Sequence, residues 1–157
     1  MQIASWNVNS VRTRLGHVLS WLDRNSVDVL ALQETKVDDP LFPLEPFQER
    51  GYHVSIHGQK SYNGVALISR QPLEDVRLGL TGELPGDSDA EELGAQKRVI
   101  SALVDGIRVV NLYVPNGSSL RSEKYSYKLN WMGCLERYLR SAETRDEPLC
   151  VVGDFNI

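Results

Sequence analysis

The spacing of hydrophobic residues along the first part of the chain predicts two strands that flank a helix. Alternation over residues 3–8 and an apolar run over residues 27–32 indicate the strands. Between them, hydrophobic positions recur every three or four residues, which predicts an amphipathic helix over about residues 11–25 with Ser10 as its N-cap. The proline-containing segment that follows predicts irregular backbone with at most one helical turn near residues 47–50.

The middle of the chain contains short segments separated by turn residues, which is typical of antiparallel strands. Strands are predicted over residues 52–57, 64–69, 75–80, 98–104 and 107–114. The last two flank Asp105-Gly106, a dipeptide that favours a tight hairpin turn. We therefore expect a meander of strands that ends in a hairpin.

The last part of the chain predicts a long helix and one more strand. Hydrophobic spacing indicates a helix from about Ser122 to Ser141. Its buried face is predicted to consist of Tyr125, Leu129, Met132, Leu135 and Leu139. The apolar residues 149–153 predict a buried strand. Because helices that cross between strands are mixed with antiparallel pairs, we expect a layered fold of the α/β or α+β class.

Composition places the chain among globular proteins. Of its 157 residues, 41% are hydrophobic and 24% are charged, which fits one packed domain over residues 1–157. No apolar stretch approaches the ~20 residues that a membrane-spanning helix needs, so no membrane segment is expected. The N-terminus has neither a basic start nor an apolar region, which predicts a cytoplasmic protein. Cys134 and Cys150 are expected to be free and buried.

Charge is unevenly distributed along the chain, whose net charge is −4. Residues 82–94 carry five carboxylates and no basic residue, which predicts a solvated, mobile loop. Basic residues outnumber acidic residues over positions 121–145, where a basic helix flank and an ordinary solvated amphipathic helix are both consistent with the pattern. An acidic protein can therefore still present a local basic surface to a polyanion.

Polar residues stand at the ends of strands that are otherwise apolar. They are Asn7, Glu34, Tyr113, Asp154 and Asn156. Taken singly, each fits a turn residue or a helix cap, and Tyr113 fits simple packing at a strand end. Together they form an oxygen-rich set without a His/Cys cluster, and such oxygen ligands suit Mg²⁺ or Mn²⁺. A metal held in this way points to phosphate chemistry.

Five sequence blocks resemble the signature motifs of the exonuclease III family of abasic-site endonucleases, within the endonuclease/exonuclease/phosphatase superfamily. The blocks are Ser5-Trp6-Asn7-Val8-Asn9-Ser10-Val11-Arg12, Leu32-Gln33-Glu34-Thr35-Lys36, Tyr62-Asn63-Gly64-Val65-Ala66, Tyr113-Val114-Pro115-Asn116-Gly117 and Gly153-Asp154-Phe155-Asn156-Ile157. They occur in family order along the whole chain. The resemblance implies the four-layered α/β sandwich of the deoxyribonuclease I-like superfamily, of which this chain would contain about the N-terminal half.

The resemblance also implies an activity and a set of site residues. The activity is Mg²⁺-dependent hydrolysis of duplex DNA on the 5′ side of abasic sites and at 3′ ends, by a protein that is monomeric at full length. Glu34 would be the metal-binding carboxylate with Asn7 beside it, and Tyr113 would lie near the scissile phosphate. Asp154 would handle a proton, Asn156 would orient water or stabilise the transition state, and both would also border the metal. The residues expected to bind DNA are Arg12, Lys60, Tyr62 and Asn116.

The family pattern continues beyond Gly-Asp-Phe-Asn into a second half that ends in an Asp-His pair, and that pair has no counterpart in this sequence. We expect the second half of the sandwich to be absent, with one face of each sheet exposed and sheet edges unpaired. Two hypotheses follow. In the first, this is an N-terminal portion of a nuclease and is inactive by itself. In the second, it is a short product that binds metal or DNA weakly without catalysis. A further alternative is another metal-dependent phosphodiesterase of the superfamily, because these enzymes use the metal in the same way.

Overall fold

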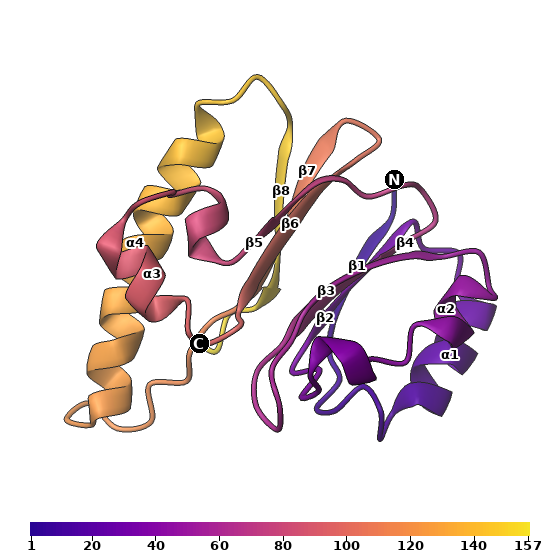
Figure 1. The fold of residues 1–157 in the computed structure, drawn as a ribbon, viewed down its shortest axis with the longest axis horizontal. Helices are drawn as coiled ribbons and strands as arrows, with labels where there is room; N and C mark the ends of the chain where they lie inside the picture. The colour runs from indigo at the N-terminus through magenta and orange to yellow at the C-terminus, as the bar shows by residue number, and fades with distance from the viewer.

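Two four-stranded sheets pack face to face, and helices cover their outer faces (Figure 1). The computed structural model describes residues 1–157. Sheet A has the order β1-β2-β4-β3 and contains β1 (Ile3–Asn7), β2 (Val29–Gln33), β3 (His53–His57) and β4 (Val65–Ser69). Sheet B has the order β5-β6-β7-β8 and contains β5 (Glu74–Leu78), β6 (Val99–Val104), β7 (Ile107–Tyr113) and β8 (Leu149–Asp154). The helices are α1 (Leu15–Arg24), α2 (Glu45–Gln48), α3 (Ser88–Leu93) and α4 (Glu123–Glu143).

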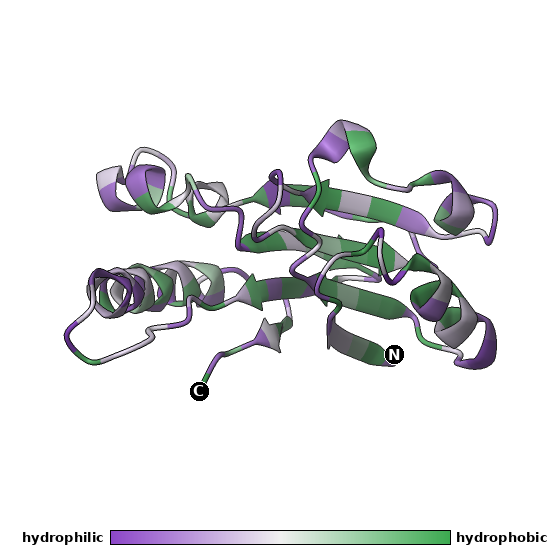
Figure 2. Cartoon of the chain, turned by 90° about the horizontal axis from the view of Figure 1, so that it is seen from below, coloured by the Kyte–Doolittle hydropathy of each residue, from purple (hydrophilic) through white to green (hydrophobic).

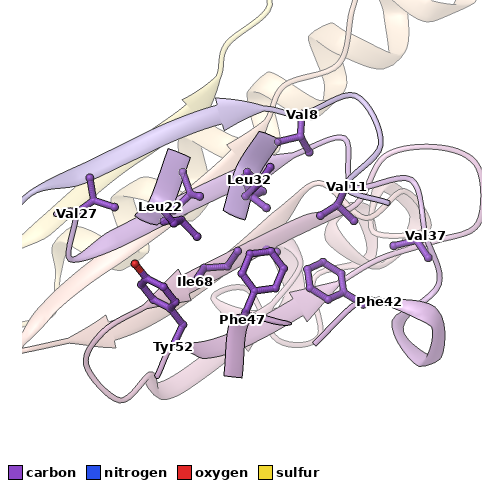
Figure 3. Close-up of a cluster of buried hydrophobic side chains, with 13 residues drawn as sticks. Val8, Val11, Leu22, Val27, Leu32, Val37, Phe42, Phe47, Tyr52 and Ile68 are labelled. Carbon is purple, nitrogen blue, oxygen red and sulfur yellow. The ribbon is translucent and has the colours of Figure 1, made fainter. Parts of the chain in front are cut away.

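Three hydrophobic clusters separate these four layers. One lies between sheet A and the helices α1 and α2, where Phe47 and Leu22 meet Ile68 of β4 (Figure 3). A second lies between sheet B and α4, and a third lies between the two sheets. Hydrophobic residues are accordingly concentrated along the strands (Figure 2). The predicted four-layered α/β sandwich is confirmed.

The expectation that one face of each sheet would be exposed is wrong. Residues 1–157 supply strands to both sheets and helices to both outer layers, so each sheet is covered on both faces. The predicted unpaired sheet edges are present, because β1 and β3 of sheet A and β5 and β8 of sheet B each pair with only one neighbour. None of the helices is both long and apolar enough to cross a membrane.

Parallel pairing brings the carboxyl ends of four strands to the same region. β1 runs parallel to β2, and β7 runs parallel to β8, whereas the other pairs are antiparallel. β1 and β8 also lie close together, so the edges of the two sheets meet. The predicted hairpin joins β6 and β7, and its turn residues Asp105 (φ 50°) and Gly106 (φ 77°) both have the left-handed conformation that a tight hairpin requires.

The first helix begins later than the hydrophobic spacing predicts. α1 starts at Leu15, and Arg14 occupies the N-cap position without a side-chain hydrogen bond. Ser10 has a φ of 85°, and its backbone N–H donates to the carbonyl of Glu34 at 2.8 Å. Because this hydrogen bond holds Ser10 beside the end of β2, residues 11–14 form turns between β1 and α1 instead of the first turn of the helix.

The acidic segment 82–94 is ordered rather than a mobile loop. Asp87 caps α3 by accepting a hydrogen bond from the N–H of Ala90, and Leu93 is buried against α4. Glu83 is only 5% exposed and accepts hydrogen bonds from its cationic and hydroxyl partners. These partners are Arg77, Arg145 and Ser141. The prediction failed because cations from other elements pair with three of the five carboxylates, namely Glu83, Asp87 and Asp89, and local composition does not reveal this pairing.

The predicted helix over residues 122–141 is confirmed as α4 with Ser122 as its N-cap, but its buried face agrees only in part with the prediction. The buried residues are Trp131, Cys134, Leu135, Tyr138 and Ala142. Leu129 and Met132 are 54% and 41% exposed. Leu135 is buried as predicted, and Leu139 packs partly buried against the same cluster. The large rings of Trp131 and Tyr138, seven positions apart, fill the space over sheet B, so Leu129 and Met132 are turned toward solvent.

The last strand and the two cysteines agree only in part with the predictions. β8, which was expected to be buried, is an edge strand with intermediate exposure throughout. Both cysteines are free as predicted, but only Cys134 is buried, since Cys150 lies on this edge strand.

Candidate active site

The space between the two sheets changes from apolar to polar toward the carboxyl ends of the parallel strands. Alternation along β2 directs Val29 and Ala31 toward sheet B, and these two residues belong to the cluster between the sheets. Gln33 is the next residue in this alternation, and the corresponding positions of β7 are occupied by Asn111 and Tyr113. The alternation that places apolar side chains between the sheets therefore also places polar side chains at one end of this space.

Glu34 and Tyr113 contact each other across the two sheets. The hydroxyl of Tyr113 donates to Oε1 of Glu34 at 2.7 Å. Glu34 has a left-handed φ of 54°, which breaks the strand alternation directly after β2 and turns its side chain toward sheet B. Burial, followed by the hydrogen bond to Glu34, raises the pKa of Tyr113 to about 12, so its hydroxyl is protonated at neutral pH and acts as the donor.

Asn7 and Asp154 form a second contact between the sheets. Nδ2 of Asn7, at the end of β1, donates to Oδ2 of Asp154, at the end of β8, at 2.8 Å. The strand register places Asp154 beside Tyr113 and Asn7 beside Gln33. The two contacts are therefore neighbours, and four of the five predicted strand-end residues come together where the two sheets approach.

Asn156 lies at the same end but is turned partly away. Its Nδ2 donates to the carbonyl of Val114 at 2.7 Å, and its backbone N–H donates to Oδ1 of Asp154 at 3.1 Å. Lys128 of α4 donates to the Asn156 carbonyl at 2.8 Å. These bonds hold Asn156 at a φ of 49° and leave Oδ1 as the amide oxygen that can face a ligand.

A cleft of about 470 Å³ opens beside the Glu34–Tyr113 contact. Tyr62 and Asn116, two of the residues predicted to bind DNA, line it together with the basic residues Lys36 and Lys124. Arg12 and Lys60, the other two predicted DNA-binding residues, are exposed and do not line the cleft. Asn7, Asp154 and Asn156 do not line it either, so the cleft covers one side of the site.

Sequence reasoning missed Arg98. Its guanidinium carbon lies 4.6 Å from the ring centroid of Tyr113, and its Nη1 donates to the Tyr113 carbonyl at 3.1 Å. Burial lowers the pKa of Arg98, and the neighbouring Tyr127 and Tyr113 oppose this shift. The signal in the sequence was a charged residue directly before a buried strand, since such a charge requires a partner.

The family model described as "Endonuclease/Exonuclease/phosphatase family" matches residues 4–157. The chain belongs to this family. Exodeoxyribonuclease III of Haemophilus influenzae is 35% identical over 162 residues, an alignment that covers 100% of this chain and 58% of that protein. The family prediction from the five sequence blocks is confirmed.

Solved structures of other family members superpose closely on this chain. A 3′-5′ exonuclease (NExo) from Neisseria meningitidis has a TM-score of 0.90 and 44% identity. An AP endonuclease from Archaeoglobus fulgidus has a TM-score of 0.88 and 42% identity. The 3′ phosphatase NExo from Neisseria bound to product DNA hairpin has a TM-score of 0.90. Each of these matches covers 100% of this chain and 58% of the other chain. The chain therefore spans somewhat more than half the length of these relatives.

In this member of the endonuclease/exonuclease/phosphatase family, the basic flank of α4 is only partly free. Arg137 pairs with Asp87 and Asp89, Arg140 pairs with Glu136, and Arg145 pairs with Glu83. Arg121 and Lys124, at the start of the helix, form no salt bridge. The cations that remain available are thus at the end of α4 nearest the cleft.

The donor set at the strand ends fits a hard divalent cation. No group of three or more His, Cys, Asp or Glu side chains gathers anywhere in the structure. The site instead offers the carboxylates of Glu34 and Asp154 and the amide oxygens of Asn7 and Asn156. Mg²⁺ characteristically takes one or two protein carboxylates and keeps water or substrate phosphate as its other ligands, so this set suits it.

Proposed function

We propose that the protein is a DNA-repair nuclease that uses Mg²⁺, or Mn²⁺ in its place, to hydrolyse phosphodiester bonds on the 5′ side of abasic sites and at 3′ ends. The observation that carries the proposal is the pair of contacts between the sheets, Glu34–Tyr113 at 2.7 Å and Asn7–Asp154 at 2.8 Å. They gather hard oxygen donors beside a cleft whose basic side chains suit a phosphate backbone. The family membership and the DNA-bound relative support the same substrate class.

In this proposal the site residues hold the cation or act on the reacting groups, and Asp154 and Asn156 do both. Glu34, Asn7, Asp154 and Asn156 would hold the cation, which would polarise a phosphoryl oxygen and neutralise charge on the leaving group. The protonated hydroxyl of Tyr113 fixes the orientation of the Glu34 carboxylate. The Asp154 carboxylate, oriented by Asn7, accepts or donates a proton at the reacting oxygen. Asn156 directs its free amide oxygen toward the attacking water.

DNA binding is proposed to depend on the phosphate backbone rather than on base sequence. Tyr62 and Asn116 border the cleft. Arg12 and Lys60 are exposed cations: Arg12 follows Val11, whose N–H donates to the carbonyl of Thr35, and the carbonyl of Lys60 accepts from the N–H of Tyr62. Contacts to phosphates position a duplex without reading its bases, so selectivity would come from the shape of an abasic site.

We further propose that the isolated 157 residues do not cleave DNA. His17 lies in α1, and His53 and His57 lie in β3. The register places His57 at the same end of sheet A as Gln33, two strands away, but no histidine lines the cleft or bonds to Glu34, Tyr113 or Asp154. The site therefore has no imidazole for proton transfer. Positioned acid–base groups contribute about 10²–10⁴-fold to rates, and groups that act as a unit lose more than the sum when one is missing.

Cation binding tests the proposed centre without requiring turnover. Titration of the purified chain with Mn²⁺, followed by electron paramagnetic resonance, should show one binding class that Mg²⁺ displaces. Glu34→Gln should weaken the Mn²⁺ affinity by about tenfold or more, since the substitution removes a charged ligand. Glu91→Gln, which alters an exposed carboxylate on α3, is the matched control and should leave affinity unchanged. Equal affinity of Glu34→Gln and the unsubstituted chain would refute the metal assignment.

A nicking assay tests the proposed inactivity. A duplex that contains one abasic site should remain intact when it is incubated with the chain and Mg²⁺. Cleavage that a chelator abolishes, and that Glu34→Gln lacks, would show that residues 1–157 suffice for catalysis.

A further inference from the structure

Two amide side chains are buried between the sheets directly beneath the Glu34–Tyr113 contact. Gln33 is 1% exposed and Asn111 is 0% exposed. Gln33 is the residue before Glu34, at the end of β2, and Asn111 is two positions before Tyr113 on β7. They stand between the apolar cluster of the sheet interface and the polar site above it.

The amide pair Gln33–Asn111 joins the two sheets by hydrogen bonds. Nε2 of Gln33 donates to Oδ1 of Asn111 at 2.8 Å. Nδ2 of Asn111 in turn donates to the carbonyls of Leu32 and Ala66, each at 2.9 Å, so one side chain of sheet B binds the backbones of both β2 and β4. Gln33 also donates to the hydroxyl of Ser5 on β1 at 3.1 Å. Three strands of sheet A are thereby connected to β7.

Two aliphatic side chains could occupy the same positions as this amide pair. Between closely packed sheets, two aliphatic side chains would fill the same space without the desolvation cost of burying amides, and replacing both partners of a buried hydrogen bond with apolar groups is often nearly neutral. The hydrogen bonds of an amide pair fix the lateral and axial position of one sheet against the other, which aliphatic contacts do not, because hydrophobic packing is non-directional. All buried side-chain polar atoms have partners, so the network is complete.

We infer that Gln33 and Asn111 are positioning residues that set the register of the two sheets so that Glu34 and Tyr113 meet. The inference deepens the proposed function, on which it rests for the importance of that contact. Glu34 and Tyr113 belong to different sheets, and no backbone pairing joins β2 to β7. A sliding of about 2 Å between the sheets, across the direction of the bond, would stretch this 2.7 Å hydrogen bond to about 3.4 Å, beyond its useful range.

The test is the energetic coupling between Glu34 and Tyr113, measured by urea unfolding of the 157-residue chain. Glu34→Ala, Tyr113→Phe and the double variant form a cycle that isolates this one contact. In the unsubstituted background, the cycle should give a coupling of about tenfold in the unfolding equilibrium constant, as expected for a hydrogen bond to a charged acceptor. The cycle is then repeated in two further backgrounds.

Asn111→Leu removes the amide pair, and Val109→Ala is its matched control. Val109 is fully buried in the cluster between the sheets. It lies on β7, on the same face as Asn111 and two residues before it. Both substitutions are expected to lower stability. Asn111→Leu should abolish the Glu34–Tyr113 coupling, so that the coupling factor falls from about ten to about one, whereas Val109→Ala should retain the coupling. Gln33→Met, which keeps side-chain length and removes the amide, serves as a second variant in case Asn111→Leu does not fold.

Every other outcome overturns the inference. If the coupling is retained in Asn111→Leu, the amide pair stabilises the fold without positioning Glu34 and Tyr113. If the coupling is lost in both Asn111→Leu and Val109→Ala, its loss reflects a general loosening of the core. Absence of coupling in the unsubstituted chain, or failure of both amide variants to fold, would also reject it. Because the cycle uses neither metal nor DNA, a chain with intact coupling that binds no Mn²⁺ would refute the proposed function alone.

Discussion

At the scale of single residues, the site depends on backbone conformations that side chains rarely adopt. Glu34, Lys36 and Asn156 all have φ values near +50°. Each such residue costs about 1–3 kcal/mol, and the conformation persists only where neighbouring bonds hold it in place. The chain supplies these bonds, since the N–H groups of Thr35 and Lys36 donate to the carbonyls of Gly64 and Asn63. The strain is concentrated where side chains must leave the regular alternation of a strand.

Gly153 is required by a close approach between β8 and β7. Its φ is 147°, and a Cβ there would lie 2.0 Å from the carbonyl oxygen of Leu112. We expect Gly153→Ala to lower the free energy of unfolding by about 3 kcal/mol, because backbone must shift beside Asp154. Gly133→Ala is the control. A Cβ there meets nothing within 4 Å inside helix α4, so it should raise stability by about 0.5–1 kcal/mol. Urea unfolding measures both, and a Gly153→Ala chain as stable as the parent would contradict the expectation.

His57 should make stability depend on pH in the mildly acidic range. Burial, followed by the charge of Lys97 and opposed by Asp39, lowers the pKa of His57 from 6.5 to about 4. The unfolded chain therefore binds a proton before the folded chain does, so this contribution to stability is complete above pH 6.5 and is lost as pH falls toward 4. His57→Gln should flatten this part of the pH profile of unfolding free energy. His53→Gln, at the exposed start of the same strand, should not, and equal flattening would argue against burial as the cause.

Most site residues could be predicted from the sequence because they belong to short motifs. Asn7, Glu34, Tyr113 and Asp154 each interrupt an apolar strand at its end, and the structure brings them together. Arg98 could not be assigned in this way. Its place against the Tyr113 ring depends on the pairing of β6 with β7, which places residues 15 positions apart in contact.

At the scale of secondary structure elements, strands were predicted better than helices. A strand between two layers needs only an apolar run, and β2 and β4 are buried at every position. A helix covers the sheet with one face only, so a small rotation exchanges its buried and exposed residues. α4 shows this effect, because Trp131 and Tyr138 rather than Leu129 and Met132 face sheet B. Helix α3 was missed because its stability depends on contacts with α4 and on charge pairing.

Glu83 connects the segment before α3 to β5 and α4, and its removal should be costly. It is 5% exposed and pairs with Arg77 at 2.7 Å and Arg145 at 3.0 Å. Glu83→Ala leaves the largely buried Arg77 without this partner, so we expect a loss of about 3 kcal/mol in the free energy of unfolding. Glu91→Ala, an exposed change on α3, should stay within about 0.5 kcal/mol. If chemical denaturation finds the two variants equally stable, the ion pairs do not anchor this segment.

At the scale of the whole molecule, charge is segregated in a way that the net value conceals. Seventeen basic residues face 21 acidic ones. On the outer side of sheet B, cations and carboxylates neutralise each other, as in the pairs of Arg137 with Asp87 and of Arg140 with Glu136. Around the cleft, Lys36 and Lys124 have no carboxylate partner within salt-bridge distance. The acidic protein therefore keeps some unpaired positive charge, that of Lys36 and Lys124, at the cleft where DNA is proposed to bind.

This segregation predicts how DNA affinity responds to salt. If Arg12 and Lys60 each neutralise one phosphate, Arg12→Ala and Lys60→Ala should each reduce the slope of log affinity against log salt by about 0.9, and the double variant by about twice that. Arg140→Ala should leave the slope unchanged, because Arg140 already pairs with Glu136 at 2.8 Å on α4. Fluorescence anisotropy of a labelled abasic duplex across a salt titration measures all four proteins against the parent. A slope that falls equally in Arg140→Ala would mean that overall charge, rather than the surface near the cleft, determines binding.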